Sequence, residues 1–106
     1  MAYSVEMTPT AERELRSSFQ YIHARAPRNA VRWLKGIYDA IGSLEEFPNR
    51  CAIAPESQHL GETVRHQLFK SHRIIFFVDE PSHSVKILYI RHAKMRTVGE
   101  SRIDKE

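Results

Sequence analysis

Side chains that suit phosphate chemistry gather in the last third of the chain. They lie on or just after predicted strands and are Arg65, Arg73, Tyr89, Arg91, His92, Lys94 and Arg96. Arginine presents a planar fork of donors to phosphate oxygens, and histidine gains and loses a proton near neutral pH. Together these residue types suit the binding or the cleavage of a phosphodiester. Singly, each also has a plainer role, such as a charge that blocks pairing at the edge of a sheet.

The charge distribution indicates the same region. Residues 1–62 carry seven Lys/Arg against eight Asp/Glu, whereas residues 63–97 carry seven against two, a formal charge of +5. Four of the six histidines also fall in the second segment. This concentration is typical of a site for a polyanion, with a solvated strand face as the alternative.

Several other kinds of site lack their sequence motifs. The sequence contains no glycine-rich phosphate loop and no G-x-S-x-G hydrolase motif. The histidines do not fall at H-x-H or H-x-x-x-H spacing, and Cys51 alone cannot form a multi-cysteine zinc site or an internal disulfide. The neighbouring Glu45 and Glu46 point to different parts of a helix surface. We therefore expect no cofactor and no metal.

Membrane insertion and secretion are also not expected. The longest apolar run, Ile74 to Val78, is far shorter than a membrane span, and the first residues lack the basic start and apolar stretch of a secretion signal. The single cysteine agrees with a reducing compartment. We expect a cytoplasmic protein with no membrane partner.

The first half of the chain predicts a strand and two helices. Residues 3–7 alternate between polar and apolar, as in a short half-buried strand. Thr8 and Pro9 then suit the start of a helix. One apolar stripe runs through Ala11, Leu15, Phe19 and Ile22, and a second runs through Ala30, Leu34, Ile37, Ile41 and Leu44. Pro27 separates the two helices, and the second should run to about Glu46. They are expected to form an antiparallel hairpin.

The second half predicts a sheet. Residues 48–63 show no periodicity and read as a long connection, followed by three sequential strands at 64–69, 73–78 and 84–92. The strand 73–78 is apolar on both faces, which predicts that it is central and covered twice. The helical hairpin is one cover, and the C-terminal segment or a partner protein is the other. The expected fold is one α+β domain over residues 1–106, in the order β-α-α-β-β-β, with the hairpin on a small, mainly antiparallel sheet.

Five segments in this order resemble the ParE/RelE superfamily of type II toxins. They are the opening strand with Thr8-Pro9-Thr10-Ala11-Glu12; Ala30-Val31-Arg32-Trp33-Leu34 running to Ile41-x-x-Leu44-x-x-Phe47-Pro48; Val64-Arg65; His72-Arg73-Ile74-Ile75-Phe76; and Val85-Lys86-Ile87-Leu88-Tyr89-Ile90-Arg91-His92-Ala93. The resemblance covers nearly the whole chain. It implies a toxin that is held inactive by an antitoxin whose C-terminal segment wraps around it.

The antitoxin is expected to contact the second apolar face of the sheet. A helix in a groove or an added strand are both open possibilities. The candidate residues that face it are Ile75, Phe77, Leu88 and Ile90.

The resemblance leaves two activities open. RelE-like toxins resemble ribosome-dependent endoribonucleases that cleave mRNA, and by position Arg65, Arg73 and His92 match members of such a catalytic set. However, Ala93 stands where the RelE branch often has arginine. RelE-like sites also use a basic or tyrosine residue near the C-terminus, and residues 95–106 contain no tyrosine, which leaves the nuclease set incomplete. ParE-like toxins, which this chain resembles in its longer hairpin, act on DNA gyrase without cutting RNA. We favour a gyrase inhibitor, with Tyr89, Arg91, Lys94 and Arg96 as candidate target contacts.

The nuclease alternative depends on strand register. If Ser71 lies opposite His92, then Arg73 lies opposite Ile90 and converges with His92 on one face. If Arg73 instead lies opposite Tyr89, it shares a face with Arg91 while His92 points away, because a slip of one residue moves a side chain to the other face.

Overall fold

The computed structural model describes residues 2–94, which form an α+β fold. Its elements, in chain order, are β1 (Ser4–Met7), α1 (Pro9–Arg25), α2 (Pro27–Gly42), the 3-10 turns η1 (Ser43–Glu45) and η2 (Pro48–Arg50), β2 (Ala52–Ile53), α3 (Ser57–Leu60), β3 (Arg65–Phe69), β4 (His72–Asp79) and β5 (Ser84–His92). The predicted order of strands and long helices is confirmed, and the expected connection contains two further short elements, β2 and α3.

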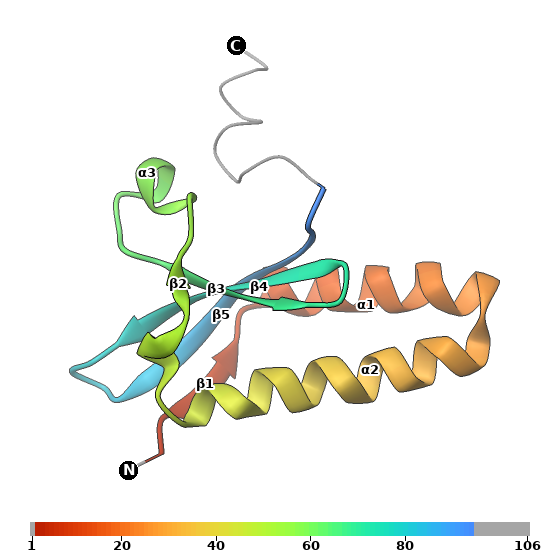
Figure 1. Ribbon diagram of the computed structural model, residues 1–106, viewed down its shortest axis with the longest axis horizontal. Helices are drawn as coiled ribbons and strands as arrows, with labels where there is room; N and C mark the ends of the chain where they lie inside the picture. Colours follow the sequence, from red (N-terminus) through yellow and green to blue (C-terminus); the bar gives the residue numbers. More distant parts are fainter. Residues whose placement is uncertain (1, 95–106) are drawn as a thin grey trace.

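The two long helices form the predicted antiparallel hairpin (Figure 1). The side chain of Thr8 accepts a hydrogen bond from the Ala11 N–H, and Pro9 occupies the first turn, so α1 begins as its sequence predicts. Ala26 has a non-helical backbone conformation and separates the two helices, and Pro27 is the first residue of α2. The second helix ends at Gly42, short of the expected end near Glu46, because the chain tightens there into η1.

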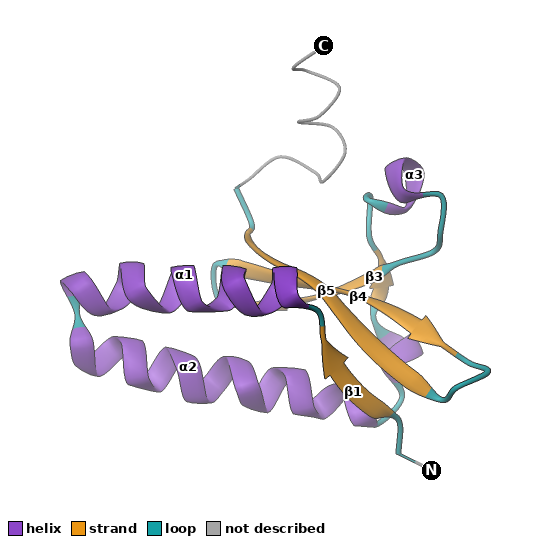
Figure 2. Cartoon of the chain, turned by 180° about the vertical axis from the view of Figure 1, so that it is seen from behind, coloured by secondary structure: helices purple, strands orange, loops and turns teal. Residues whose placement is uncertain are grey.

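The sheet has five strands in the order β1-β5-β4-β3-β2. The first strand pairs parallel to β5, and every other pair is antiparallel. Figure 2 shows β1 along one edge and the long strands β4 and β5 in the middle. The register of β4 and β5 shifts between Ile75 and Phe76, so a bulge lies at the centre of the sheet.

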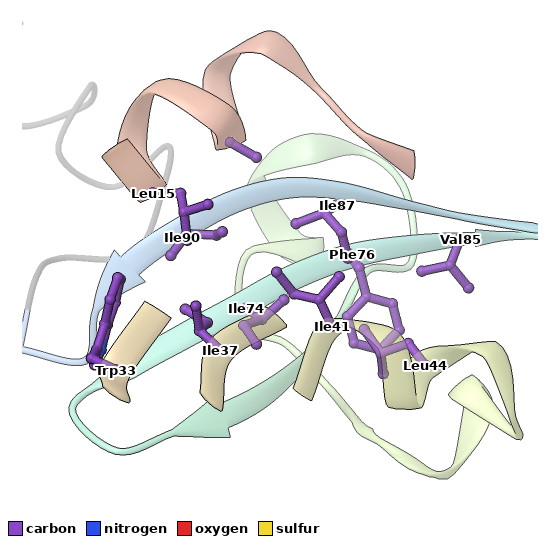
Figure 3. Packing of buried hydrophobic residues seen from close by; sticks show 11 residues of the cluster. Leu15, Trp33, Ile37, Ile41, Leu44, Ile74, Phe76, Val85, Ile87 and Ile90 are labelled. Atoms are coloured by element: carbon purple, nitrogen blue, oxygen red, sulfur yellow. The ribbon is translucent and has the colours of Figure 1, made fainter. Parts of the chain in front are cut away.

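The main core lies between the helical hairpin and one face of the sheet, which we call the helix face. Figure 3 shows Ile37 and Ile41 of α2 beside Ile74 and Phe76 of β4. All four belong to one cluster of buried residues, which Leu15 of α1 also joins. The hairpin is therefore the predicted first cover of the central strand, and its burial is the main hydrophobic contribution to the fold.

The opposite face of the sheet, which we call the loop face, is covered in part by the chain itself. Ala54 and Val64 form a second buried cluster with Ile75, and Leu60 of α3 packs against it. The loop closes on itself, since the Ala54 N–H donates to the Val64 carbonyl at 2.8 Å. The sequence predicted the C-terminal segment or a partner as the second cover. The structure corrects this expectation, because residues 54–64 lie over Ile75.

No helix within residues 2–94 is long and apolar enough to cross a membrane.

A matched pair of glycine variants tests how tightly α2 packs on the sheet. A Cβ atom at Gly36 would lie 2.6 Å from Cζ of the Phe69 ring, whereas one at Gly42 would meet nothing within 4 Å. Overpacking costs about 1–3 kcal/mol, and alanine gains up to about 1 kcal/mol over glycine in a helix. We expect Gly36→Ala to be less stable than Gly42→Ala by more than about 1 kcal/mol in urea denaturation. Equal stabilisation by both substitutions would contradict the close contact.

Candidate functional site

The register of β4 and β5 separates the predicted phosphate-binding residues. Arg73 lies opposite Arg91, and His72 lies opposite His92, so neither of the two registers considered from the sequence is the observed one. Because side chains alternate along a strand, His92 lies on the helix face with Ile90, while Arg73 lies on the loop face with Arg91. Arg73 and His92 therefore point away from each other, as in the second alternative.

Arg65 does not complete a cluster with His92 either. It pairs with Phe76 and so belongs to the helix face, but Phe76 lies four positions along β4 from His72, about 13 Å of strand. The Nη1 group of Arg65 donates to the Cys51 carbonyl at 2.7 Å. The three residues that matched a nuclease set are thus distributed over both faces of the sheet, with Arg65 far from the end that holds Arg73 and His92.

Arg73 is held in a buried ion pair. Its two terminal nitrogens bind the two carboxylate oxygens of Glu56, with 3.0 Å between Nη1 and Oε1, and the side chains are 9% and 0% exposed. Nη1 also donates to Nδ1 of His66 at 3.1 Å. Burial, followed by the charge of Arg73, lowers the pKa of His66 below its ordinary value. Arg73 therefore anchors the 54–64 loop on the sheet.

The remaining predicted contact residues differ in accessibility. On the loop face, Tyr89 packs against the second cluster, and Arg91 is half-buried beside Arg73. Lys94 is exposed just beyond the end of β5, whereas Arg96 lies outside the described residues.

Two of the four residues expected to face the antitoxin are not accessible. Ile75 is completely buried under the chain's own loop, and Ile90 is 2% exposed in the core on the helix face. The expectation that they form a partner surface is corrected, because intramolecular contacts already cover them. Phe77 and Leu88 are half-buried at the margin of the second cluster, which leaves part of each exposed.

A cavity of about 440 Å³ opens on the helix side beside His92. Its polar and aromatic lining includes Ser18 and Tyr21 of α1, Trp33 of α2, and His72 and His92. The His72 and His92 rings lie 5.5 Å apart in an edge-on arrangement. His72 is 8% exposed, and its Nε2 atom lies 3.2 Å from the Ser18 hydroxyl. Burial, followed by the neighbouring His92, lowers the pKa of His72.

The sequence interpretation missed His72 and Glu56 as site residues. His72 immediately precedes the predicted apolar strand and lies two residues before Ile74. Because residues two apart on a strand share a face, this spacing was the signal that could have placed His72 on the helix face. Glu56 gave no signal, because a single glutamate in an aperiodic segment usually lies in solvent.

Helix α1 substitutes for an edge strand along the second half of β5. The Glu14 carboxylate accepts the backbone N–H of Ile90 at 2.8 Å, and the Thr8 hydroxyl donates to the Leu88 carbonyl at 3.2 Å. Burial raises the pKa of Glu14, although the hydrogen bond from Ile90 lowers it in part. These contacts hold α1 against β5 and so fix one wall of the cavity beside His92.

The described residues do not bring the candidate proton-transfer and charge-stabilising groups together. Within residues 2–94, no three histidine, cysteine or acidic side chains are grouped so as to hold a metal ion. Arg73, whose guanidinium lies beside His66, is already occupied by Glu56. The exposed basic side chains are instead suited to electrostatic contacts with an anionic partner.

Comparison with known proteins defines the class of this fold. The family model described as "ParE toxin of type II toxin-antitoxin system, parDE" matches residues 5–97. The chain therefore belongs to the ParE toxin family, and it is a ParE-type toxin of a type II toxin-antitoxin system. Among curated proteins, no significant match to the sequence was found.

Solved toxin-antitoxin structures share the fold. The chain is similar to one from the chromosomal ParDE system of P. aeruginosa, with a TM-score of 0.72, 21% identity, and coverage of 88% of this chain and 98% of that one. It is also similar to one in the RelBE2 complex of Mycobacterium tuberculosis, with a TM-score of 0.59, 22% identity, and coverage of 87% and 99%. The archaeal RelE-RelB complex of Pyrococcus horikoshii gives a TM-score of 0.59, 16% identity, and coverage of 91% and 100%.

The buried ion pair can be tested against an exposed one. Glu56→Gln leaves the charge of Arg73 buried without a counter-charge, which should lower the free energy of unfolding by about 3–5 kcal/mol. The control Asp39→Asn breaks the Lys35–Asp39 pair, whose side chains are 80% and 73% exposed, and should change stability little. Combining Glu56→Leu with Arg73→Met should recover most of the loss in thermal or urea unfolding. A Glu56→Gln variant as stable as wild type would refute the anchoring role.

The low pKa of His72 predicts a pH-dependent stability. The unfolded chain titrates near the ordinary value of 6.5, whereas folding lowers the pKa, so between the two values the unfolded state binds more protons. Stability should therefore fall as the pH drops below about 6.5 and level off below the folded pKa. His72→Gln should reduce this slope in unfolding curves measured from pH about 8 to about 5, whereas the exposed-site control His59→Gln should preserve it. An unchanged slope in the His72 variant would disprove the assignment.

Proposed function

We propose that this toxin inhibits growth by binding DNA gyrase, and that a cognate antitoxin neutralises it. The observation that carries the proposal is the buried pair between Arg73 and Glu56, on the sheet face opposite to His92. Cleavage of a phosphodiester requires a proton-transfer group and a charge-stabilising group within hydrogen-bond reach of one phosphate. In this chain, the two best candidates for those roles are on different faces.

Two further features support a gyrase target. The match over residues 5–97 is to a ParE model, and Ala93 replaces an arginine that the RelE-like nucleases often carry. The exposed Lys94 lies two residues beyond the end of β5, and Arg91 lies near the end of the same strand. These cations, with Tyr89 and Arg96, are the proposed contacts with the target.

The antitoxin contact is proposed at the margin of the loop face. Phe77 and Leu88 are apolar, half-buried and adjacent to the second cluster, so an added apolar segment would complete their burial. A peptide that covers them gains about 25 cal/mol for each Å² of apolar surface removed from water. The segment therefore extends the cover that residues 54–64 begin.

A ribosome-dependent mRNA endoribonuclease is the second candidate. The specific observation in its favour is the His72–His92 pair at the cavity that Lys70 also lines, because two imidazoles beside a cation can exchange protons with a bound phosphodiester. Under this alternative, His92 is a catalytic residue.

Two variants and two readouts separate the candidates. We expect His92→Ala to leave growth inhibition largely intact, whereas a chain ending at Ala93 should be weaker because it lacks the cations from Lys94 onward. The wild type and the two variants are each expressed without antitoxin. The DNA-damage response and mRNA cleavage are then scored in the same cells. DNA damage with intact mRNA is the expected result for wild type.

The opposite pattern would reject gyrase as the target. Loss of a proton-transfer group typically costs about 10²-fold to 10⁴-fold in rate, so under the nuclease alternative His92→Ala abolishes toxicity together with mRNA cleavage. Antitoxin binding checks the folding of each variant. Cleaved mRNA without DNA damage in the wild type would independently support the nuclease.

A further inference from the structure

The helical hairpin carries a basic surface that neither the sheet nor the gyrase proposal uses. Residues 15–38 contain five Lys/Arg and no Asp/Glu, although the chain to residue 62 is close to neutral as a whole. The five are Arg16, Arg25, Arg28, Arg32 and Lys35, and all are exposed. The basic residues of the chain therefore form a second concentration, separate from the strands.

Three of these side chains form one stripe on α2. Arg28, Arg32 and Lys35 are spaced by four and three residues, which places them on one side of the helix. The residues buried against the sheet, Trp33 and Ile37 among them, lie on the other side. We call Arg28, Arg32 and Lys35 the basic stripe. It begins at the α1–α2 turn, which projects at the end of the molecule opposite the β4–β5 turn (Figure 1).

The charges of the stripe are largely uncompensated. Among the described residues, the structure contains two carboxylate ion pairs, Arg73–Glu56 and Lys35–Asp39, so Arg28 and Arg32 have no acidic partner. Like charges four residues apart on a helix destabilise it by about 0.2–0.5 kcal/mol. An anion bound across the two arginines would offset this repulsion.

Arg25, the last residue of α1, is positioned beside the adjoining turn. The guanidinium of Arg25 lies 3.8 Å from the centre of the Tyr21 ring and donates to the Tyr21 carbonyl at 3.2 Å. Arg25 is thereby held beside the first turn of α2, where the stripe begins. A fixed cation loses less conformational entropy on binding than a free one, so this geometry favours recognition of a charged partner.

We propose that the basic stripe, together with Arg25, binds the phosphate backbone of duplex DNA. Arg28 and Arg32 are about 6 Å apart along the helix axis, so they reach successive phosphates rather than one anion. The planar fork of arginine matches phosphate oxygens, and phosphate contacts of this kind position a protein on a duplex without reading its sequence. An acidic protein segment is the alternative partner, and the experiment below distinguishes it from DNA.

This inference rests on the proposed function in one respect: gyrase acts on duplex DNA, so a toxin bound to gyrase lies close to a duplex. The stripe would contact DNA directly, independently of the cations at the end of β5. Its contribution is sequence-independent and salt-sensitive, as expected for contacts made only with phosphates.

A charge-matched pair of double variants tests the stripe. Arg28→Gln with Arg32→Gln removes two of its charges, and the control Arg13→Gln with Lys86→Gln removes two exposed charges elsewhere. The full chain is titrated onto a labelled mixed-sequence duplex of about 30 base pairs, without gyrase, over a series of KCl concentrations. Each lost phosphate contact lowers the slope of log affinity against log salt by about 0.9. We expect the stripe variant to lose about two in slope and the control to match wild type.

Three results would overturn the proposal. One is a stripe variant with the wild-type slope, and another is an equal loss in both double variants, which would show only a net-charge effect. The third is unchanged duplex binding with loss of binding to a poly-glutamate peptide, which would assign the stripe to an acidic protein. Retained antitoxin binding verifies that both variants fold. Because gyrase is absent, a negative result here leaves the gyrase proposal to be judged by its own DNA-damage readout.

Discussion

The fold depends on one constraint, which is that the central strand β4 is apolar on both faces and must be shielded from water twice. The helical hairpin shields Ile74 and Phe76, and the loop 54–64 shields Ile75. The hairpin has two amphipathic helices to bury, whereas the loop has only a small apolar cluster and a four-residue helix. The buried pair of Arg73 and Glu56 adds a polar attachment to this small apolar contact. If the loop moved away, the buried charge of Arg73 would lose its counter-charge and its hydrogen bonds, so the pair holds the loop in place.

This use of Arg73 determines what the sheet can do chemically. A buried guanidinium that is matched by a carboxylate is poorly available to a substrate, since its release would leave Glu56 uncompensated at high cost. The alternation of side chains then places His92 on the face where the helices lie. The same strand pair therefore offers a structural anchor on one side and a histidine-lined cavity on the other. Binding functions are compatible with this division, because they do not require both groups at one atom.

Much of the fold was predictable from local pattern, whereas the pairing of distant residues was not. The stripes of α1 and α2, the Pro27 break and the two-sided apolarity of β4 are periodic features of the sequence, and they are confirmed. The register was not accessible, because the bulge at Ile75 and Phe76 adds a residue that no pattern marks. Glu56 lies in an aperiodic stretch, so its pairing with Arg73 depends on loop closure. The separation of Arg73 from His92 follows from the shifted register and not from any local pattern in the sequence.

The parallel pairing of β1 with β5 has a consequence for synthesis. The strand β5 lies between β1 and β4, although β1 is made long before β5, and about 80 residues separate paired positions such as Val5 and Val85. Until β5 leaves the ribosome, the helical hairpin has only part of its sheet to cover, and the edges of β1 and β4 stay open. Long-range closure of this kind slows folding and prolongs the exposure of apolar surface. The five-stranded sheet therefore cannot close until β5 has been synthesised, so the toxin fold forms only after nearly all of the described residues have been made.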